Sequence, residues 1–180
     1  MPGPRWVRVA TNLVAGVAML SFIAAFWWDG VVVAVFALVL LGVTVPRVAG
    51  LPGVVQAATG ATLILGAWAA TLDWYAAVPG LDLLVHAVAN GMLALVAVLV
   101  MVRYQALAPL SSRLGAIIVT AGVGALLGVI WEAGEWFGHT FLNDAIGVGY
   151  DDTVGDLVAG TLGSALAGAA LGTTTGAEDG

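Results

Sequence analysis

The stretch GVIWEAGEWFGH, residues 128–139, ends a long apolar run with three ionisable side chains. The residues before it are nearly all Val, Ala, Leu and Gly, and about 20 such residues span a bilayer as a helix. Glu132, Glu135 and His139 follow at spacings of three and four, which place them on one stripe of that helix. Ionisable groups in a membrane span are costly, so this stripe indicates a functional site or a partner helix.

The composition of the whole chain excludes an ordinary soluble domain. Of the 180 residues, 61% are hydrophobic and 9% are charged, and the mean hydropathy is +1.06, whereas a soluble domain carries about 25% charged residues. Such a chain cannot cover its surface with polar groups. We therefore predict an integral membrane protein, built as an all-α polytopic helical bundle. The chain has no Cys, which excludes disulfides and thiolate metal sites.

Turn residues separate the hydrophobic runs into about six spans, which we predict to form a single membrane domain over residues 1–180. The second span is the weakest because Pro46 interrupts it near its end, so a re-entrant segment and a lower span count are alternatives. The expected spans cover residues 9–28, 31–48, 54–72, 83–102, 114–137 and 153–172, and a short polar tail, 173–180, follows.

The positions of the basic residues predict the orientation of the chain. With six spans, all five fall in the N-terminal tail, the second loop and the fourth loop, which lie on the same side of the membrane. Basic loops stay in the cytoplasm, so we expect both termini to be cytoplasmic in a multi-pass protein of the cell membrane. These residues are Arg5, Arg8, Arg47, Arg103 and Arg113.

Two further spans carry ionisable residues at the same outer end as Glu132. Asp82, His86 and Asn90 are four residues apart at the start of the fourth span, and Asp152 and Asp156 open the sixth. Small residues continue the stripes of the fifth and sixth spans inward, as in helices that pack closely; they are Gly124, Gly128, Gly160, Ser164 and Gly168. We expect one outward-facing pocket formed by Asp82, His86, Glu132, Glu135, Asp152 and Asp156.

The chemistry of these six side chains predicts a divalent metal ion. Oxygen and nitrogen ligands suit Mg, Mn, Ca or Zn, and their spacing does not choose among these metals. Glu132, Glu135 and His86 are the candidate catalytic residues, since a carboxylate or an imidazole can move protons beside a polarising ion. The alternatives are a proton- or cation-binding transporter, a non-catalytic scaffold, and a purely local role of Asp82 and Asp152 as helix N-caps.

Other cofactors and partners are not expected. The chain has no glycine-rich phosphate motif that would hold a nucleotide or a flavin. Five scattered arginines do not form a nucleic-acid patch. A membrane lipid is the expected partner, and a homo-oligomer is left open.

The motifs of the last three spans also resemble a known family. Asp82-x3-His86, WEAGEW with Glu132 and Glu135, and YDDTVGDLVAGTLGS at residues 150–164 resemble the YjdF-like (DUF2238) bacterial membrane proteins. They resemble the VanZ-like proteins more distantly. The resemblance implies that the six residues named above form a shared site, whereas His139 matches no family position. VanZ-like proteins are linked to the cell envelope, which implies a lipid or lipid-linked substrate.

Overall fold

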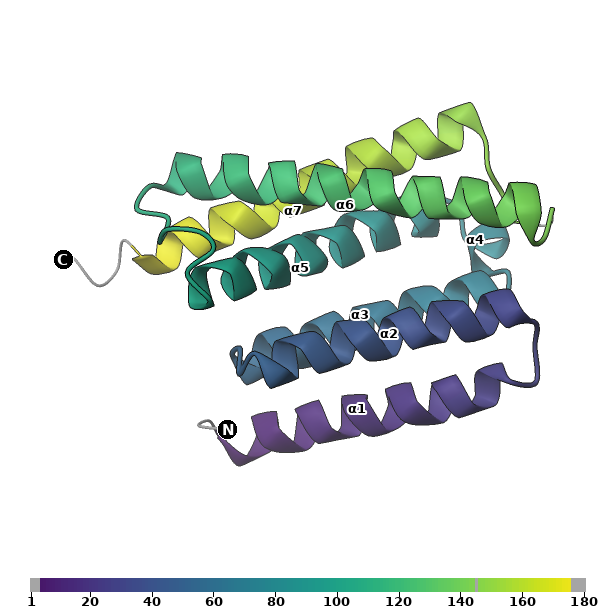
Figure 1. Cartoon of the computed structure of the whole chain (residues 1–180), viewed down its shortest axis with the longest axis horizontal. Coiled ribbons are helices and arrows are strands. Elements are labelled where there is room, and N and C mark those ends of the chain that lie inside the picture. Colours follow the sequence, from purple (N-terminus) through teal and green to yellow (C-terminus); the bar gives the residue numbers. More distant parts are fainter. Residues whose placement is uncertain (1–3, 145, 176–180) are drawn as a thin grey trace. The chain divides into compact units, whose positions relative to one another are not determined.

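The computed structural model describes residues 4–144 and 146–175, and within them the secondary structure is entirely helical (Figure 1). Six helices are long and apolar enough to cross a membrane, which confirms the predicted polytopic α-helical bundle. Residues 176–180 of the predicted polar tail lie outside the described residues. The helices are α1 (Arg5–Ala25), α2 (Gly30–Val48), α3 (Gly53–Thr71), α4 (Trp74–Ala77), α5 (Leu81–Arg103), α6 (Arg113–Phe141) and α7 (Tyr150–Thr175).

The helix ends differ from the predicted spans by a few residues. α6 continues to Phe141, so that His139 lies in its last turn. α2 passes through Pro46 and ends at Val48. The proline has no N–H, so α2 lacks one backbone hydrogen bond close to its C-terminal end. The short α4 was not predicted, because four residues carry no periodicity.

The chain divides into two compact units, residues 1–81 and residues 82–180. The first contains α1 to α4, and the second contains essentially all of α5 together with α6 and α7. The single membrane domain over the whole chain stays a prediction.

Large side chains of α2 fill the core of the first unit. Phe36 is fully buried, and its ring centroid lies 4.9 Å from that of Trp68 in α3. Alanines of α1 and α3 face them, which lets the bulky side chains interdigitate with small ones. The buried core comprises Ala18, Ala25, Phe36, Val39, Val43 and Ala67.

Side-chain hydrogen bonds tie α1 to both neighbouring helices. Arg47 of α2 donates to the Asn12 Oδ1 atom at 2.7 Å, and the Trp68 indole of α3 donates to the Ser21 hydroxyl at 3.0 Å. Polar side chains are thus paired across the helices, as expected where lipid offers no hydrogen bonds.

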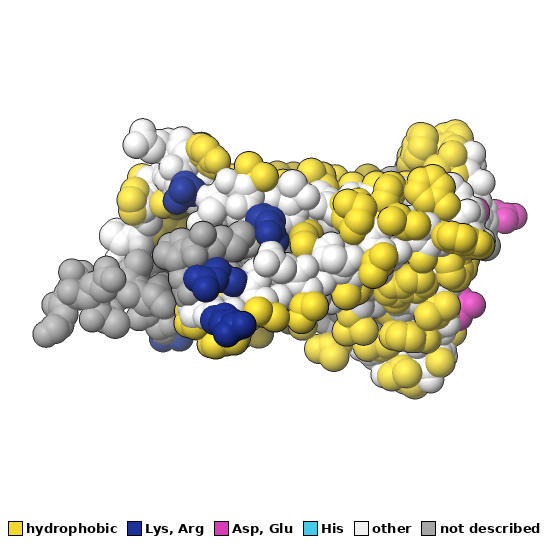
Figure 2. All heavy atoms as spheres, turned by 90° about the horizontal axis from the view of Figure 1, so that it is seen from below, with side chains coloured by type: hydrophobic (Ala, Val, Ile, Leu, Met, Phe, Trp, Pro, Cys, Tyr) yellow, Lys and Arg dark blue, Asp and Glu magenta, His cyan; other side chains and the backbone are white. Residues whose placement is uncertain are grey.

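The two ends of the first unit carry opposite charges. Arg5 and Arg8 lie in the first turn of α1, and Arg47 lies in the last turn of α2. At the other end of α2, the Asp29 carboxylate caps the helix by accepting two backbone N–H groups at 2.9 and 3.0 Å. Figure 2 draws one face of the whole chain. On that face arginines lie at one end, acidic groups lie at the other, and many hydrophobic side chains lie between them.

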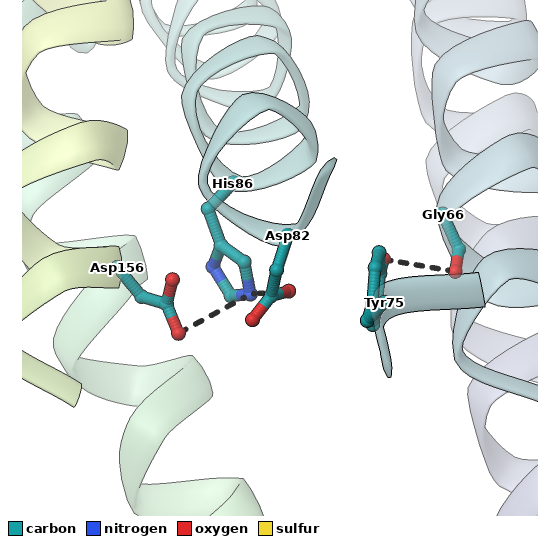
Figure 3. Close-up of polar contacts among 5 residues, drawn as sticks. All are labelled: Gly66, Tyr75, Asp82, His86 and Asp156. Carbon is teal, nitrogen blue, oxygen red and sulfur yellow. Dashed lines mark hydrogen bonds and ion pairs between the residues drawn. The ribbon is translucent and has the colours of Figure 1, made fainter. Parts of the chain in front are cut away.

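Two polar side chains brace the turns of the first unit. The Gln56 amide donates to the Leu51 carbonyl at 2.7 Å, so it fixes the turn between α2 and α3. The Tyr75 hydroxyl of α4 donates to the Gly66 carbonyl of α3 at 3.1 Å, a contact drawn in Figure 3. Both bonds satisfy carbonyls within the unit's own backbone.

The second unit is packed by small residues. The buried positions of α7 recur every four residues, at Asp156, Gly160, Ser164 and Gly168. A Cβ atom on Gly168 would lie only 2.6 Å from the Ala116 carbonyl oxygen of α6. The backbones of α6 and α7 therefore touch, and a larger side chain would force them apart.

The contact between α5 and α7 is equally close. A Cβ atom on Gly91 of α5 would lie 2.8 Å from the Gly163 carbonyl oxygen of α7. In return, a Cβ atom on Gly163 would overlap the backbone of Ala87. These backbone contacts leave little freedom to slide one helix along the other, so they fix the register of the unit.

Candidate functional site

Asn90 of α5 lies at the point where the three helices of the second unit meet. Its amide Nδ2 donates to the Gly124 carbonyl of α6 at 2.9 Å. A Cβ atom on Gly160 of α7 would lie 3.2 Å from the Asn90 Cβ atom, and one on Gly128 of α6 would lie 3.4 Å from the Asn90 Nδ2 atom. Glycines on two helices thus make room for this one amide side chain. The same glycine contacts determine which residues of the three helices lie side by side one helical turn further along.

One helical turn from Asn90, the next layer consists of ionisable residues. α5 and α7 run in the same direction, so the residues one turn from Asn90 and Gly160 toward the same end are His86 and Asp156. On α6 the residue one turn beyond Gly128 is Glu132. The glycine contacts therefore bring together three polar residues that are distant in sequence.

His86 lies between two carboxylates. Its Nε2 atom is 3.5 Å from the Asp82 Oδ1 atom of the same helix and 3.6 Å from the Asp156 Oδ2 atom of α7. Figure 3 shows the imidazole and the Asp156 carboxylate pointing toward each other. One ligand atom from each of the three residues lies within 4.8 Å of the others. Ligands bonded at about 2.4 Å on opposite sides of an ion are about 4.8 Å apart, so the cluster has suitable dimensions.

Asp156 is the most deeply buried member of this cluster. It is 4% exposed, and its Oδ1 atom is buried without a hydrogen-bond partner among the described residues. A buried ionised oxygen without a partner costs several kcal/mol, roughly, unless a proton or a cation compensates it. Either a proton or a cation on Asp156 would compensate this oxygen.

The remaining predicted site residues surround this cluster. Glu132 is buried, with 9% exposure, and it interacts electrostatically with Asp156 and with Glu135. Glu135 is half-buried and accepts a hydrogen bond from the Trp131 indole. Asp152 is exposed but still within the electrostatic range of Asp156. The ligand and catalytic roles of all six residues stay predictions.

The alternative role of Asp82 and Asp152 as helix N-caps differs from the structure. Asp82 and Asp152 lie within the first turns of α5 and α7, one or two residues inside the helix rather than at a capping position. His139 lies apart from the described ligand cluster, because its Nδ1 atom contacts the Ile146 carbonyl at 2.7 Å. A carbonyl only accepts hydrogen bonds, so this nitrogen carries the proton. His139 thereby braces the loop that joins α6 to α7.

The sequence interpretation missed the partners of the acidic residues. Trp131 precedes Glu135 by four residues, a helical spacing that could have indicated the hydrogen bond. Asn90 was placed on the correct stripe, but its hydrogen bond across to Gly124 depends on how the helices pack.

The comparisons with known proteins give a family match. A family described as "Predicted membrane protein (DUF2238)" matches residues 6–177. No curated protein matches the chain, and no solved structure does.

Proposed function

Since the chain belongs to the DUF2238 family of predicted membrane proteins, we propose that its second unit binds a divalent cation at an outward-facing Asp/His/Glu site. We propose further that this site acts on a cell-envelope lipid or a lipid-linked substrate. The first part rests on the arrangement of Asp82, His86 and Asp156, whose ligand atoms lie within 4.8 Å of one another. The unpartnered buried oxygen of Asp156 supports it.

Cation binding is tested with the full chain in detergent after removal of metals by a chelator. Mg²⁺, Mn²⁺, Ca²⁺ and Zn²⁺ are added separately, and the bound metal and the midpoint of thermal unfolding are measured. At 100 times the dissociation constant, a cation that binds only the folded chain adds about 2.7 kcal/mol to its free energy of unfolding.

Asp156→Asn keeps the shape of the side chain but removes its charge, and we expect at least a tenfold weaker affinity. Asp151→Asn is the matched control, because Asp151 is exposed in the first turn of the same helix. Equal cation binding by the wild type and Asp156→Asn would contradict the proposal.

The lipid substrate is supported by the setting of the site. Trp131 and Trp136 flank the acidic residues of α6 and are exposed, and exposed tryptophans favour the interface between lipid and water. A lipid headgroup would reach a site at that depth by lateral diffusion.

The test is mass spectrometry of an envelope-lipid extract incubated with the cation-loaded protein. We expect a product that Glu132→Gln no longer forms. Unchanged lipids in both samples would refute the enzymatic part and leave cation binding standing.

The orientation is part of the same proposal. Arg103 ends α5 and Arg113 begins α6, so the arginines of the second unit lie at the end of α5 opposite Asp82, about 30 Å away by the helical rise. Basic ends stay in the cytoplasm, which directs the acidic end outward. Reporter fusions at the two termini should both give a cytoplasmic signal. Opposite signals would contradict the orientation.

Transport is a weaker interpretation of the same site. Below the His86 layer, the buried and half-buried polar side chains that join the helices of the second unit are uncharged among the described residues: Asn90, Thr120 and Ser164. The backbone contacts of Gly163 and Gly168 close the unit in that direction. A proton or cation path would need ionisable groups or space at this depth.

A further inference from the structure

We infer that the cation of the second unit is a four-coordinate ion of the Zn²⁺ class, held by Asp82, His86 and Asp156, with its fourth position open to an exchangeable ligand. This inference rests on the proposed cation site and adds the identity and the coordination of its ion. The Zn²⁺ class comprises Zn²⁺ and the transition-metal ions that replace it in the same geometry, such as Co²⁺.

The distances between the ligand atoms match a tetrahedral ion. The His86 Nε2 atom lies 3.5 Å from the Asp82 Oδ1 atom and 3.6 Å from the Asp156 Oδ2 atom. Ligands about 2.0–2.2 Å from a tetrahedral Zn²⁺ ion lie about 3.3–3.6 Å from one another. Adjacent ligands of an octahedral Mg²⁺ ion, at about 2.0–2.1 Å, lie only about 2.8–3.0 Å apart. Both pairs are therefore spaced for Zn²⁺ rather than for Mg²⁺.

The third pair of ligand atoms has room to adjust. One oxygen of Asp82 and one of Asp156 lie within 4.8 Å of each other. Asp82 lies in the first turn of α5, and its side chain is 31% exposed, against 19% for His86 and 3% for Asp156. The more exposed aspartate is thus free to turn toward an ion that the two buried ligands hold.

The imidazole of His86 disfavours calcium. Ca²⁺ accepts similar separations between ligands, because its ligands lie at about 2.3–2.6 Å, but it prefers oxygen. Both measured distances end on an imidazole nitrogen, and imidazole suits Zn²⁺ and the neighbouring transition metals. Distance and ligand chemistry together therefore select the Zn²⁺ class.

The buried oxygen of Asp156 is a separate observation that a cation would explain. Oδ1 is buried and has no hydrogen-bond partner in the described part of the chain, and Figure 3 shows the carboxylate directed toward the imidazole. A cation bound to this carboxylate offsets the cost of burying its charge. Two aspartates also balance the charge of one divalent ion, so a single ion makes the ligand group neutral.

Three protein ligands leave one position of a tetrahedral ion to a water or a substrate atom. Among the described residues, the ligand group contains Asp82, His86 and Asp156. Structural zinc sites have four protein ligands, whereas catalytic sites keep one position open. At that position the ion polarises a bound water or a carbonyl oxygen. The arrangement therefore favours a catalytic ion over one that only holds the helices together.

The test uses Co²⁺ as a probe on the full chain in detergent, after removal of metals by a chelator. Tetrahedral Co²⁺ absorbs visible light much more strongly than octahedral Co²⁺, so the spectrum reports the geometry. We expect an intense visible spectrum that Zn²⁺ abolishes and that excess Mg²⁺ or Ca²⁺ leaves unchanged. Added azide should shift the spectrum, because it occupies the open position.

The two histidines of the chain provide a matched pair of variants. His86→Gln removes the imidazole ligand, and we expect its Zn²⁺ affinity, measured by competition with a coloured chelator, to fall by about 100-fold or more. His139→Gln is the control, because His139 contacts the Ile146 carbonyl and is not a member of the ligand group. It should keep the affinity and the Co²⁺ spectrum of the wild type.

Each other result has a definite meaning. A weak octahedral spectrum, or displacement of Co²⁺ by Mg²⁺ or Ca²⁺, would overturn this inference and leave the proposed cation site intact. A tetrahedral spectrum that azide does not change would overturn the open position. Equal Zn²⁺ affinities of the wild type and His86→Gln, or no bound cation at all, would remove the proposed cation site as well. If His86→Gln does not fold, the wild-type spectrum still decides.

Discussion

The two units of this protein are packed by different means. The first buries Phe36 and large aliphatic side chains against alanines, and the buried side-chain atoms that it leaves without a hydrogen-bond partner among the described residues, Gln56 Oε1 and Thr59 Oγ1, are uncharged. The second joins its helices through glycines whose backbones touch, and it keeps a buried carboxylate oxygen, Asp156 Oδ1, for which the described residues offer no hydrogen-bond partner.

This difference shows what a close backbone contact provides in lipid. Interdigitated large side chains can be exchanged for others of similar volume with modest effect. A glycine contact fixes both the distance and the register of two helices, because nothing but the absent side chain permits the approach. A site whose ligands come from separate helices needs such a fixed register, and Asp82, His86 and Asp156 are found in the unit that has it.

The largest expected effect tests whether the units are independent. Phe36→Ala should lower the free energy of unfolding by about 3 kcal/mol, because it leaves a cavity in the first unit. It should leave the cation affinity of the second unit unchanged. The measurements are thermal unfolding and metal binding in detergent. The control is Leu38→Ala, since Leu38 is exposed on the same helix. A loss of cation affinity in Phe36→Ala would show that the units depend on each other.

A smaller effect is expected from crowding the second unit. Gly168→Leu would force the backbones of α6 and α7 apart, and we expect a loss of about 1–3 kcal/mol with weaker cation binding. Gly122→Leu is the matched control on α6, because a Cβ atom there meets nothing within 4 Å. If both variants unfold at the same temperature as the parent, glycine packing does not hold this unit together.

The smallest change in stability should come from Asn90, but it should also affect the site. Asn90→Leu removes the hydrogen bond to Gly124, which is worth about 0.6–2 kcal/mol between membrane helices. Asn90 holds the helices together one turn from His86 and Asp156. We therefore expect about tenfold weaker cation binding, the loss found when a residue that positions a metal ligand is removed. Asn12→Leu removes a hydrogen bond of the first unit instead and should not change binding. Equal cation affinities for both variants would show that Asn90 has no positioning role.

Much of the fold followed from the sequence, because lipid leaves few choices. Each span must be apolar, long and helical, so the runs of Val, Leu and Ala predicted six spans before any contact was known. Helix ends were less predictable: α1 covers Arg5–Ala25 where residues 9–28 were expected, and α6 ends at Phe141 where residue 137 was expected, because turn residues act only through their local hydrogen bonds. The periodicity also placed Glu132, His86 and Asp156 on stripes.

The sequence by itself determined the membrane setting, the family motifs and the face of each helix that carries the polar residues. The tertiary structure decided which of those residues meet. It brought Asp82, His86 and Asp156 within 4.8 Å of one another, left Glu132 beside them, and turned His139 to the loop at Ile146. The physical reason is that periodicity fixes positions within one helix, whereas the register between helices depends on backbone contacts such as that of Gly91 with Gly163. These contacts join residues far apart in the chain, and no local pattern encodes them.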